Sequence, residues 1–404
     1  SGGMPKLLGS TDSFADFYYY YGDDEGTDRP AQTWAALRAC PTLPHSERHG
    51  GFYVAAKYQD ICEIERNPAV FSSASGTTVP PKEYSLIPID LDSPRHELYR
   101  RLLNPSFSPQ HMRDREPELR QLARELLTEA SRHEEFDFCA VFSRPFPQRT
   151  ALRIIGFPDR DRESISGWVD DMVRKMDQPE VVMSSAAQLA GRILAVVAEH
   201  RTRPADPSLI SILVHASIEG RPLTDEELVN YVTLLLFGGV DTTSSAIAGA
   251  MRYLIEDPEV ADRLRAEPAL LRTAADEFIR WTAPVQGQAR TVRTTGEVTV
   301  GGCPLRDGDK VFMLFASGNR DADAFTDPDQ VLVDRTPNRH LGFGMGPHRC
   351  IGSHLARLMV EIALGESLGL LADYTIADPA AITWMSSESR GISGLPLRRK
   401  RTGE

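Results

Sequence analysis

Apolar residues recur at intervals of three or four along most of the chain, which is the spacing of one face of an α-helix. This periodicity predicts helices at residues 33–38, 58–66, 95–103, 117–131, 184–201, 225–256 and 270–281. Strand-like stretches are short and occur at residues 51–55 and within 289–315, with turn signals at Gly301-Gly302 and Asp307-Gly308. We therefore expect a mainly α-helical fold with small β-sheets.

The longest predicted helix has a clear start and an unusual middle. Thr224 followed three residues later by Glu227 is a capping box, which predicts the helix start. Two consecutive glycines begin at Gly238, and each glycine inside a helix costs about 1 kcal/mol relative to alanine. In one interpretation, the helix widens beside a ligand and the Thr242 hydroxyl bonds the Gly238 carbonyl. In the other, Asp241 caps a new helix.

Length and charge narrow the class of protein. No Pro/Gly/Ser-rich linker, charge block or repeat divides the 404 residues, so we expect one domain over residues 1–404, with residues 1–3 (Ser-Gly-Gly) as a cloning remnant. The formal net charge of 45 − 57 = −12 disfavours nucleic acid as a partner. Since no run of about 18 apolar residues is present, we expect no membrane association.

Cysteine usage indicates a reducing compartment. The five cysteines are odd in number and form no CxxC pair, which argues against a disulfide framework. The expected location is the cytoplasm.

One cysteine stands in a glycine-punctuated loop just before a helical pattern. The loop runs from Phe343 to Gly352, and apolar residues at helical spacing follow it, so Cys350 should lie near a helix N-terminus, where the helix dipole favours a thiolate. Gly346 and Gly352 permit backbone conformations that other residues avoid and let the chain lie flat against a planar group. A thiolate beneath a planar group suggests haem iron, although a buried structural thiol is the ordinary alternative.

The loop matches Phe-x-x-Gly-x-x-x-Cys-x-Gly, the signature of the cytochrome P-450 family, and the chain resembles that family from residue 12 to residue 397. The resemblance implies a triangular helical body around a buried haem b (iron protoporphyrin IX), with Cys350 as the iron ligand. Other residues that it places against the haem are Phe343, Gly344, Gly352 and Gly238.

The resemblance also implies a haem-dependent monooxygenase, an oxidoreductase that inserts one atom of O2 into an unactivated C–H bond. Asp241 and Thr242 would be catalytic and pass protons to dioxygen. Two alternatives stay open, a peroxygenase that uses H2O2 and a non-enzymatic haem-thiolate sensor. Relatives that use peroxide usually lose the acid–alcohol pair, which this chain retains, and a sensor would not need it.

Charged residues at matching positions suggest two further sets. By resemblance, the haem propionates are bound by His96, Arg100, Arg290 and His348. Glu277 and Arg280 share a helix face at i and i+3, which alone is typical of a surface salt bridge. In the family this pair is buried and joined by an arginine that corresponds to Arg335, and it braces the proximal haem wall.

Family topology places substrate contacts in variable segments. The candidate residues are Tyr84, Ile87, Leu234, Phe237, Val285, Gln286 and Ser389. The run 84–88 (Tyr-Ser-Leu-Ile-Pro) resembles the camphor-hydroxylase branch, in which the loop tyrosine bonds a substrate carbonyl. Tyr84 is then either that anchor or a buried structural tyrosine. We expect a small, largely apolar substrate such as a terpenoid or another secondary metabolite.

The electron donor should be a separate protein, because the chain carries no flavin or iron–sulfur motif. The resemblance implies a ferredoxin with its ferredoxin reductase. The candidate docking residues are Arg101, Arg113, Arg115, Arg349 and Arg357, each of which is equally well explained as a solvated arginine.

Overall fold

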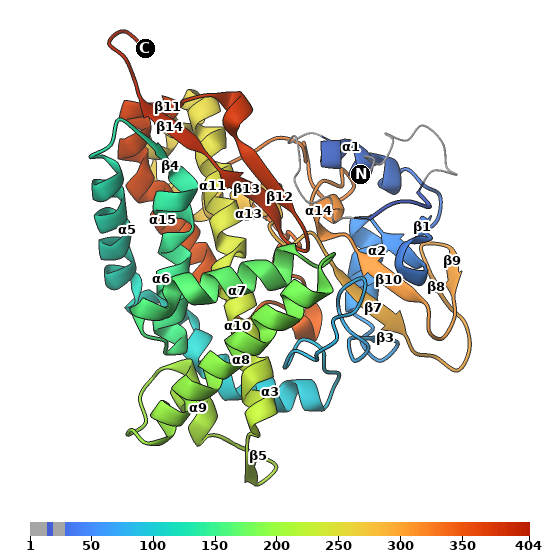
Figure 1. Ribbon diagram of the computed structural model, residues 1–404. Helices are drawn as coiled ribbons and strands as arrows, with labels where there is room; N and C mark the ends of the chain where they lie inside the picture. The colour runs from blue at the N-terminus through green and yellow to red at the C-terminus, as the bar shows by residue number, and fades with distance from the viewer. Residues whose placement is uncertain (1–13, 19–28) are drawn as a thin grey trace.

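The computed structural model describes residues 14–18 and 29–404, so the remnant expected at residues 1–3 lies outside the described residues. Helices form most of the body, and the strands of the largest sheet gather on one side of it (Figure 1). The α-helices are α1 (Arg29–Arg38), α2 (Tyr58–Glu65), α3 (Arg95–Leu103), α4 (Pro109–Asp114), α5 (Glu116–Ala130), α6 (Pro145–Ile155), α7 (Arg162–Arg174), α8 (Pro179–Arg201), α9 (Leu209–His215), α10 (Asp225–Val240), α11 (Thr242–Glu256), α12 (Pro258–Ala266), α13 (Leu271–Thr282), α14 (Phe315–Gly318) and α15 (Ser353–Asp373).

The main sheet joins distant parts of the chain in the order β1-β2-β10-β7-β3. Its strands are β1 (His45–Ser46), β2 (Phe52–Ala55), β3 (Phe71–Ser72), β7 (Gln288–Val292) and β10 (Lys310–Met313). β2 and β10 pair in parallel, and the other pairs are antiparallel. In Figure 1 the blue N-terminal strands therefore lie beside the orange ones.

The remaining strands form small antiparallel sheets. These are β4 (Glu135–Asp137) with β11 (Tyr374–Ile376) and β14 (Pro396–Arg399), β12 (Thr383–Ser386) with β13 (Arg390–Gly394), β5 (Ser217–Ile218) with β6 (Arg221–Pro222), and β8 (Val298–Val300) with β9 (Cys303–Leu305). The β8–β9 turn places Gly301 and Gly302 at φ +55° and +74°, a region that favours glycine, so the predicted turn is confirmed.

The predicted mainly helical class is confirmed, and helix ends differ from the sequence prediction by a few residues. The largest difference is at α8, which begins at Pro179 because proline fits the first helical turn. The capping box between Thr224 and Glu227 is present at the start of α10. The predicted continuous helix 225–256 is wrong in one respect, since α10 and α11 meet at an interruption at Asp241.

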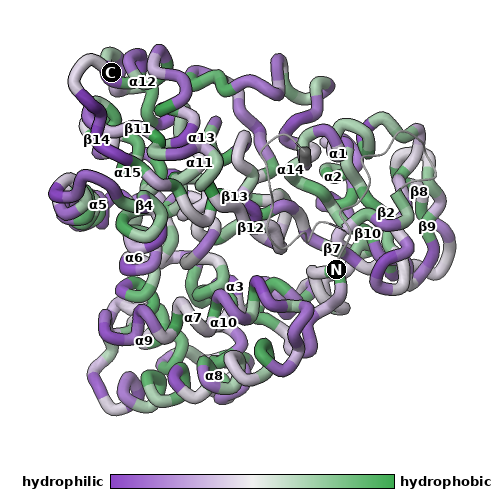
Figure 2. The backbone as a smooth tube through the Cα atoms, turned by 45° about the horizontal axis from the view of Figure 1, so that its top comes forward, coloured by the Kyte–Doolittle hydropathy of each residue, from purple (hydrophilic) through white to green (hydrophobic). Residues whose placement is uncertain are grey.

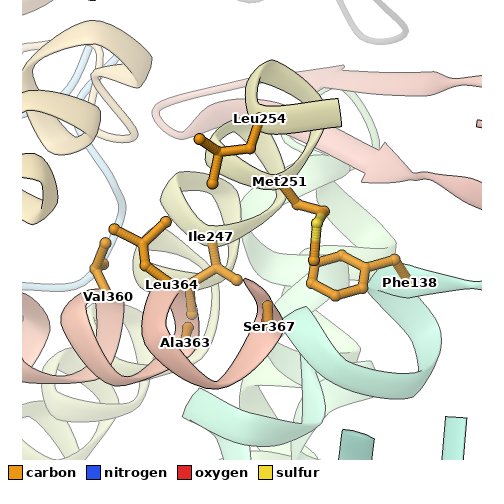
Figure 3. Close-up of a pocket in the computed structure, with 8 residues that line it drawn as sticks. All are labelled: Phe138, Ile247, Met251, Leu254, Val360, Ala363, Leu364 and Ser367. Atoms are coloured by element: carbon orange, nitrogen blue, oxygen red, sulfur yellow. The ribbon is translucent and has the colours of Figure 1, made fainter. Parts of the chain in front are cut away.

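The largest core cluster lies between α11, α13, α15 and α5. In surface helices such as α5, polar and apolar residues alternate along the chain (Figure 2). The buried face of α5 carries leucines and alanines. Figure 3 shows side chains of α11 and α15 meeting that of Phe138 around a cavity of about 10 Å³. Ser367 lines this cavity, and its hydroxyl has no hydrogen-bond partner among the described residues.

Within residues 14–18 and 29–404, two helical segments are long and apolar enough to cross a membrane by length and composition alone. They are α8, in which 28% of the apolar window is buried, and the run 225–256, in which 65% is buried. The expected absence of membrane association therefore stays a prediction.

Candidate functional site

The loop before α15 presents Cys350 in a defined conformation. The Cys350 N–H donates to the Phe343 carbonyl at 2.8 Å, which closes the loop. Gly344 and Gly346 have φ of +66° and +71°, so both use the conformational freedom of glycine. Gly352 does not, because its φ is −88°. The expectation of an unusual backbone is thus confirmed at Gly346 and wrong at Gly352.

The thiol environment differs from the sequence prediction. All five cysteines are described and free, and Cys350 is the exposed one. Although the residue is exposed, the densely packed protein around it raises the pKa of the thiol by burial. The Gly352 N–H and nearby guanidinium groups oppose this shift without reversing it. The protein alone therefore does not favour the thiolate, and a bound cation at the sulfur would be needed to hold it.

A histidine of the cysteine loop meets a histidine from α3. The rings of His96, on α3, and His348 have centroids 4.0 Å apart. Burial and the Arg290 cation lower the pKa of His348 to about 2, and burial with Arg100 lowers the pKa of His96. Both rings are therefore neutral at pH 7 and offer N–H donors rather than charge. The buried Nδ1 of His96 has no hydrogen-bond partner among the residues described.

The two predicted arginines lie in different settings. Arg100 is half-buried and donates to the carbonyls of Pro347 (3.4 Å) and Arg349 in the cysteine loop. Arg290 is buried on β7, and its Nη2 lies 3.0 Å from Oε1 of Glu65. The structure thus gives Arg290 a carboxylate partner within the protein, which the sequence did not predict.

These groups fit a haem. An accessible thiol, an unpartnered buried imidazole nitrogen and a half-buried guanidinium come together at Cys350, His96 and Arg100. This donor set suits a planar group that is held through a metal on one side and carries carboxylates at its edge.

On the helix side, the predicted Thr242 contact is present. Its Oγ1 donates to the Gly238 carbonyl at 2.9 Å. Asp241 occupies the N-cap position of α11, so the predicted start of a new helix is confirmed. Its side chain makes no capping hydrogen bond, so the predicted cap itself is absent. A Cβ at Gly238 would meet nothing within 4 Å, whereas one at Gly239 would lie 2.7 Å from Ala151 on α6. Helix packing thus requires Gly239, and Gly238 leaves open space.

Asp241 points into a cluster of charged residues from α7, together with Arg144, which immediately precedes α6. Its Oδ1 lies 3.7 Å from the Arg174 guanidinium, and its buried Oδ2 has no hydrogen-bond partner among the described residues. Burial and the neighbouring Asp170 carboxylate raise the pKa of Asp241 to about 6, against the opposing effect of Arg174 and Arg144. A carboxyl with this pKa changes protonation near neutral pH, as a proton-transfer group must.

The predicted brace is fully buried. Glu277 and Arg280 are 0% exposed, and Arg280 Nε donates to Glu277 Oε1 at 2.6 Å. Arg335 Nε donates to both oxygens of Glu277 at 3.1 and 3.0 Å. The surface salt-bridge alternative is therefore wrong. The brace ties α13 to the segment that precedes the cysteine loop.

Among the substrate candidates, the structure separates cavity residues from structural ones. Tyr84 lines a cavity of about 250 Å³ formed by residues 74–78, 82–85 and 90. The Gln286 amide is instead occupied, since it donates to Ser386 (3.1 Å) and to the Ser387 carbonyl (2.7 Å). The other candidates are Ile87 and Ser389, which are buried, and Leu234, Phe237 and Val285, which are half-buried.

The predicted docking arginines form part of a basic group around His354. Arg349, Arg357 and Arg113 lie near it together with Arg272, and with burial they lower its pKa. Arg357 Nε also bonds Asp276 at 2.8 Å, so its charge is partly used inside the protein. The remaining two candidates are Arg101, which is exposed, and Arg115, which pairs with Glu118 at 3.2 Å.

Comparison with known proteins gives the family. A model of the cytochrome P-450 family matches residues 180–370. A steroid C26-monooxygenase of Mycolicibacterium smegmatis is 32% identical over 369 residues, which cover 90% of this chain and 90% of that protein. The chain belongs to the cytochrome P-450 family. P-450 proteins bind haem b through a cysteine thiolate and use O2, a small-molecule substrate and redox partners, and this chain is accordingly an oxidoreductase, a monooxygenase.

Solved P-450 structures share the fold. Mycobacterium marinum CYP268A2 in complex with pseudoionone superposes with a TM-score of 0.85 at 28% identity, over 92% of this chain and 95% of that one. Bacillus megaterium CYP109E1 in complex with testosterone gives a TM-score of 0.84 at 30% identity, over 92% and 98%. The predicted P-450 fold is confirmed.

Sequence reasoning missed three residues of this P-450 site. Glu65 pairs with Arg290, Arg174 faces Asp241, and Lys82 Nζ lies 2.6 Å from Glu388 Oε1. Each contact joins segments far apart in the chain. For Glu65, the available signal in the sequence was a charged residue on the apolar face of a predicted helix. The sequence around Arg174 and Lys82 gave no such signal.

Proposed function

We propose that this P-450 is a ferredoxin-dependent enzyme that hydroxylates an unactivated C–H bond of a terpenoid or other largely apolar secondary metabolite. The proposal takes the chain as one haem-binding domain. Its main support is the site itself, in which the Thr242–Gly238 contact, a titratable Asp241 and the Cys350 loop occur together. Relatives named for steroid oxidation, and solved structures with pseudoionone or testosterone, support a largely apolar substrate.

The cysteine side would hold the haem. Cys350 would ligate the iron, and the hydrogen bond from its N–H to the Phe343 carbonyl fixes the backbone of the loop that carries it. His96 and His348 would donate N–H groups to the propionates, with Arg100 and Arg290 as the cations of that edge. When bound, haem supplies the activation of dioxygen at a thiolate-ligated iron, which is chemistry that side chains lack.

The helix side would deliver protons. Thr242 keeps its hydroxyl oriented through the Gly238 carbonyl, and the interruption at Asp241 frees the local helix from a regular hydrogen-bond ladder. Asp241, with its pKa near 6, can take up a proton from the charged cluster and release it at neutral pH. Turning toward Thr242 would require Asp241 to leave Arg174, a contact of 3.7 Å that is loose enough to exchange.

The cavity beside Tyr84 would receive the polar end of the substrate. No described residue accepts a hydrogen bond from its hydroxyl, and burial with the nearby Glu388 carboxylate raises its pKa, so it remains a donor. The Lys82–Glu388 ion pair joins this loop, in which Lys82 also lines the cavity, to the β12–β13 turn. These contacts support the anchor interpretation of Tyr84.

Electrons would arrive on the face that carries Arg113, Arg272, Arg349 and His354. This basic group suits an acidic ferredoxin because complementary charge accelerates association. Reduction by a ferredoxin should therefore slow as ionic strength rises.

The decisive test is a titration of the ferric protein with terpenoid and steroid compounds, followed by turnover. We expect a low-spin to high-spin change with at least one compound, and a hydroxylated product when ferredoxin, its reductase and NAD(P)H are supplied. No spin change with any member of either class would refute the substrate proposal. Turnover with H2O2 but none with ferredoxin would refute the electron-supply proposal.

A further inference from the structure

Glu65 is a buried carboxylate at the edge of the site for which the proposed mechanism has no use. It is the last residue of α2, and its side chain is 3% exposed. Its Oε1 lies 3.0 Å from Arg290 Nη2, and its Oε2 accepts the Met345 N–H at 3.1 Å. Both carboxylate oxygens are therefore engaged, one by β7 and the other by the cysteine loop.

The backbone around Glu65 is also packed against the cysteine loop. A Cβ at Gly346 would lie 2.8 Å from the Glu65 carbonyl oxygen, and one at Gly344 would lie 3.7 Å from its Oε2. The end of α2 thus approaches the loop as closely as glycine permits. A charge at this position is held rigidly relative to Cys350.

Charge balance makes this contact notable. Burial lowers the pKa of Arg290, and three carboxylates act against that shift. They are Glu65, which has the largest effect of the three, Asp92 and Asp90. Burying a carboxylate costs several kcal/mol unless a partner compensates it, and the Arg290 cation is that partner here. Arg290 is therefore already neutralised within the protein, and a haem propionate would have to share it.

We propose that Glu65 is a positioning residue that lowers the reduction potential of the haem iron. In the step concerned, one electron from the redox partner converts Fe³⁺ to Fe²⁺, and the site gains one negative charge. A rigid buried carboxylate opposes that gain through a low-dielectric interior, and it weakens the hold of Arg290 on the propionate, which acts in the same direction. The inference rests on the proposed placement of Arg290 at the haem edge.

The test compares Glu65→Gln and Glu65→Met with Glu63→Gln in the haem-loaded protein. Glu63 lies on the same helix, two residues earlier, and is exposed. The control variant Glu63→Gln therefore removes one negative charge from a solvent-exposed position of the same helix. The readout is the ferric/ferrous potential from spectroelectrochemistry. We expect both Glu65 variants to raise the ferrous-to-ferric ratio at a fixed ambient potential about tenfold, which is about 59 mV for one electron, and Glu63→Gln to change it less than twofold.

The outcomes separate the inference from the proposed function. An unchanged or more negative potential in the Glu65 variants would overturn the inference, and so would loss of haem from both, which would assign Glu65 a purely structural role. If the wild-type ferrous carbonyl complex lacks the red-shifted Soret band of thiolate ligation, the proposed haem ligation fails instead. Retention of that band with a raised potential supports both.

Discussion

Replacing Glu277 by glutamine should destabilise this P-450 strongly, because this fully buried side chain is the common acceptor of a network of several donors. It receives two hydrogen bonds from Arg280, two from Arg335, one from the Leu332 N–H at 2.6 Å and one from Asn338 at 3.3 Å. Glutamine retains the shape but removes the charge and points N–H donors at two guanidinium groups. Breaking a buried ion pair costs about 3–5 kcal/mol.

The assay is denaturant unfolding of the haem-loaded protein, followed by far-UV circular dichroism and the Soret band together. The control is Glu118→Gln, which breaks the exposed i,i+3 pair with Arg115 and should cost less than about 1 kcal/mol. We expect Glu277→Gln to lower the free energy of unfolding by at least about 3 kcal/mol. A loss similar to that of the control would refute the claim that burial makes this network costly to break.

Three further outcomes test the site. Cys350→Ser should abolish the red-shifted Soret band of the ferrous carbonyl complex, and its retention would exclude Cys350 as the ligand. Thr242→Ala should leave substrate-induced spin changes intact but divert NAD(P)H consumption to peroxide. Thr243→Ala, the control, should not divert NAD(P)H consumption to peroxide. Equal coupling of NAD(P)H consumption to product in the two variants would contradict the proton-delivery role. Asp241 has a pKa raised to about 6 by burial, so its contribution to stability is present at low pH and lost as pH rises through 6. Asp241→Asn should therefore be more stable than wild type at pH 8, by about 3 kcal/mol or less, with the difference shrinking toward pH 5; a pH-independent difference in unfolding free energy would argue against this assignment.

Local signals were readable from the sequence because they depend on neighbouring residues. The capping box at Thr224 and the turn at Gly301-Gly302 each arise from chemistry within a few positions, and the structure confirms them. Gly352 shows the limit of such reasoning, since glycine permits an unusual φ without requiring one. The interruption at Asp241 could be suspected from the preceding glycines, but not decided, because packing against Ala151 determines the role of Gly239.

Electrostatic partners could not be read in the same way. Glu65 and Arg290 are separated by 225 positions, and Lys82 and Glu388 by 306. The residues around one member of a pair do not predict the other member, because long-range pairing is set by how the helices and the sheet pack. The raised pKa of the Cys350 thiol has the same origin, because burial is a property of the whole fold and outweighs the local helix N-terminus.

The amino-acid sequence by itself determined the family and the mainly helical class, and it predicted which residues carry the chemistry, since a loop cysteine, a glycine-interrupted helix and a Glu-x-x-Arg pair are each short patterns. Tertiary structure alone decided how those residues are charged and oriented. It neutralised His96 and His348, gave Arg290 an internal carboxylate and turned Asp241 toward Arg174. The physical reason is that protonation and ion pairing depend on burial and on partners that the chain brings together only when it folds.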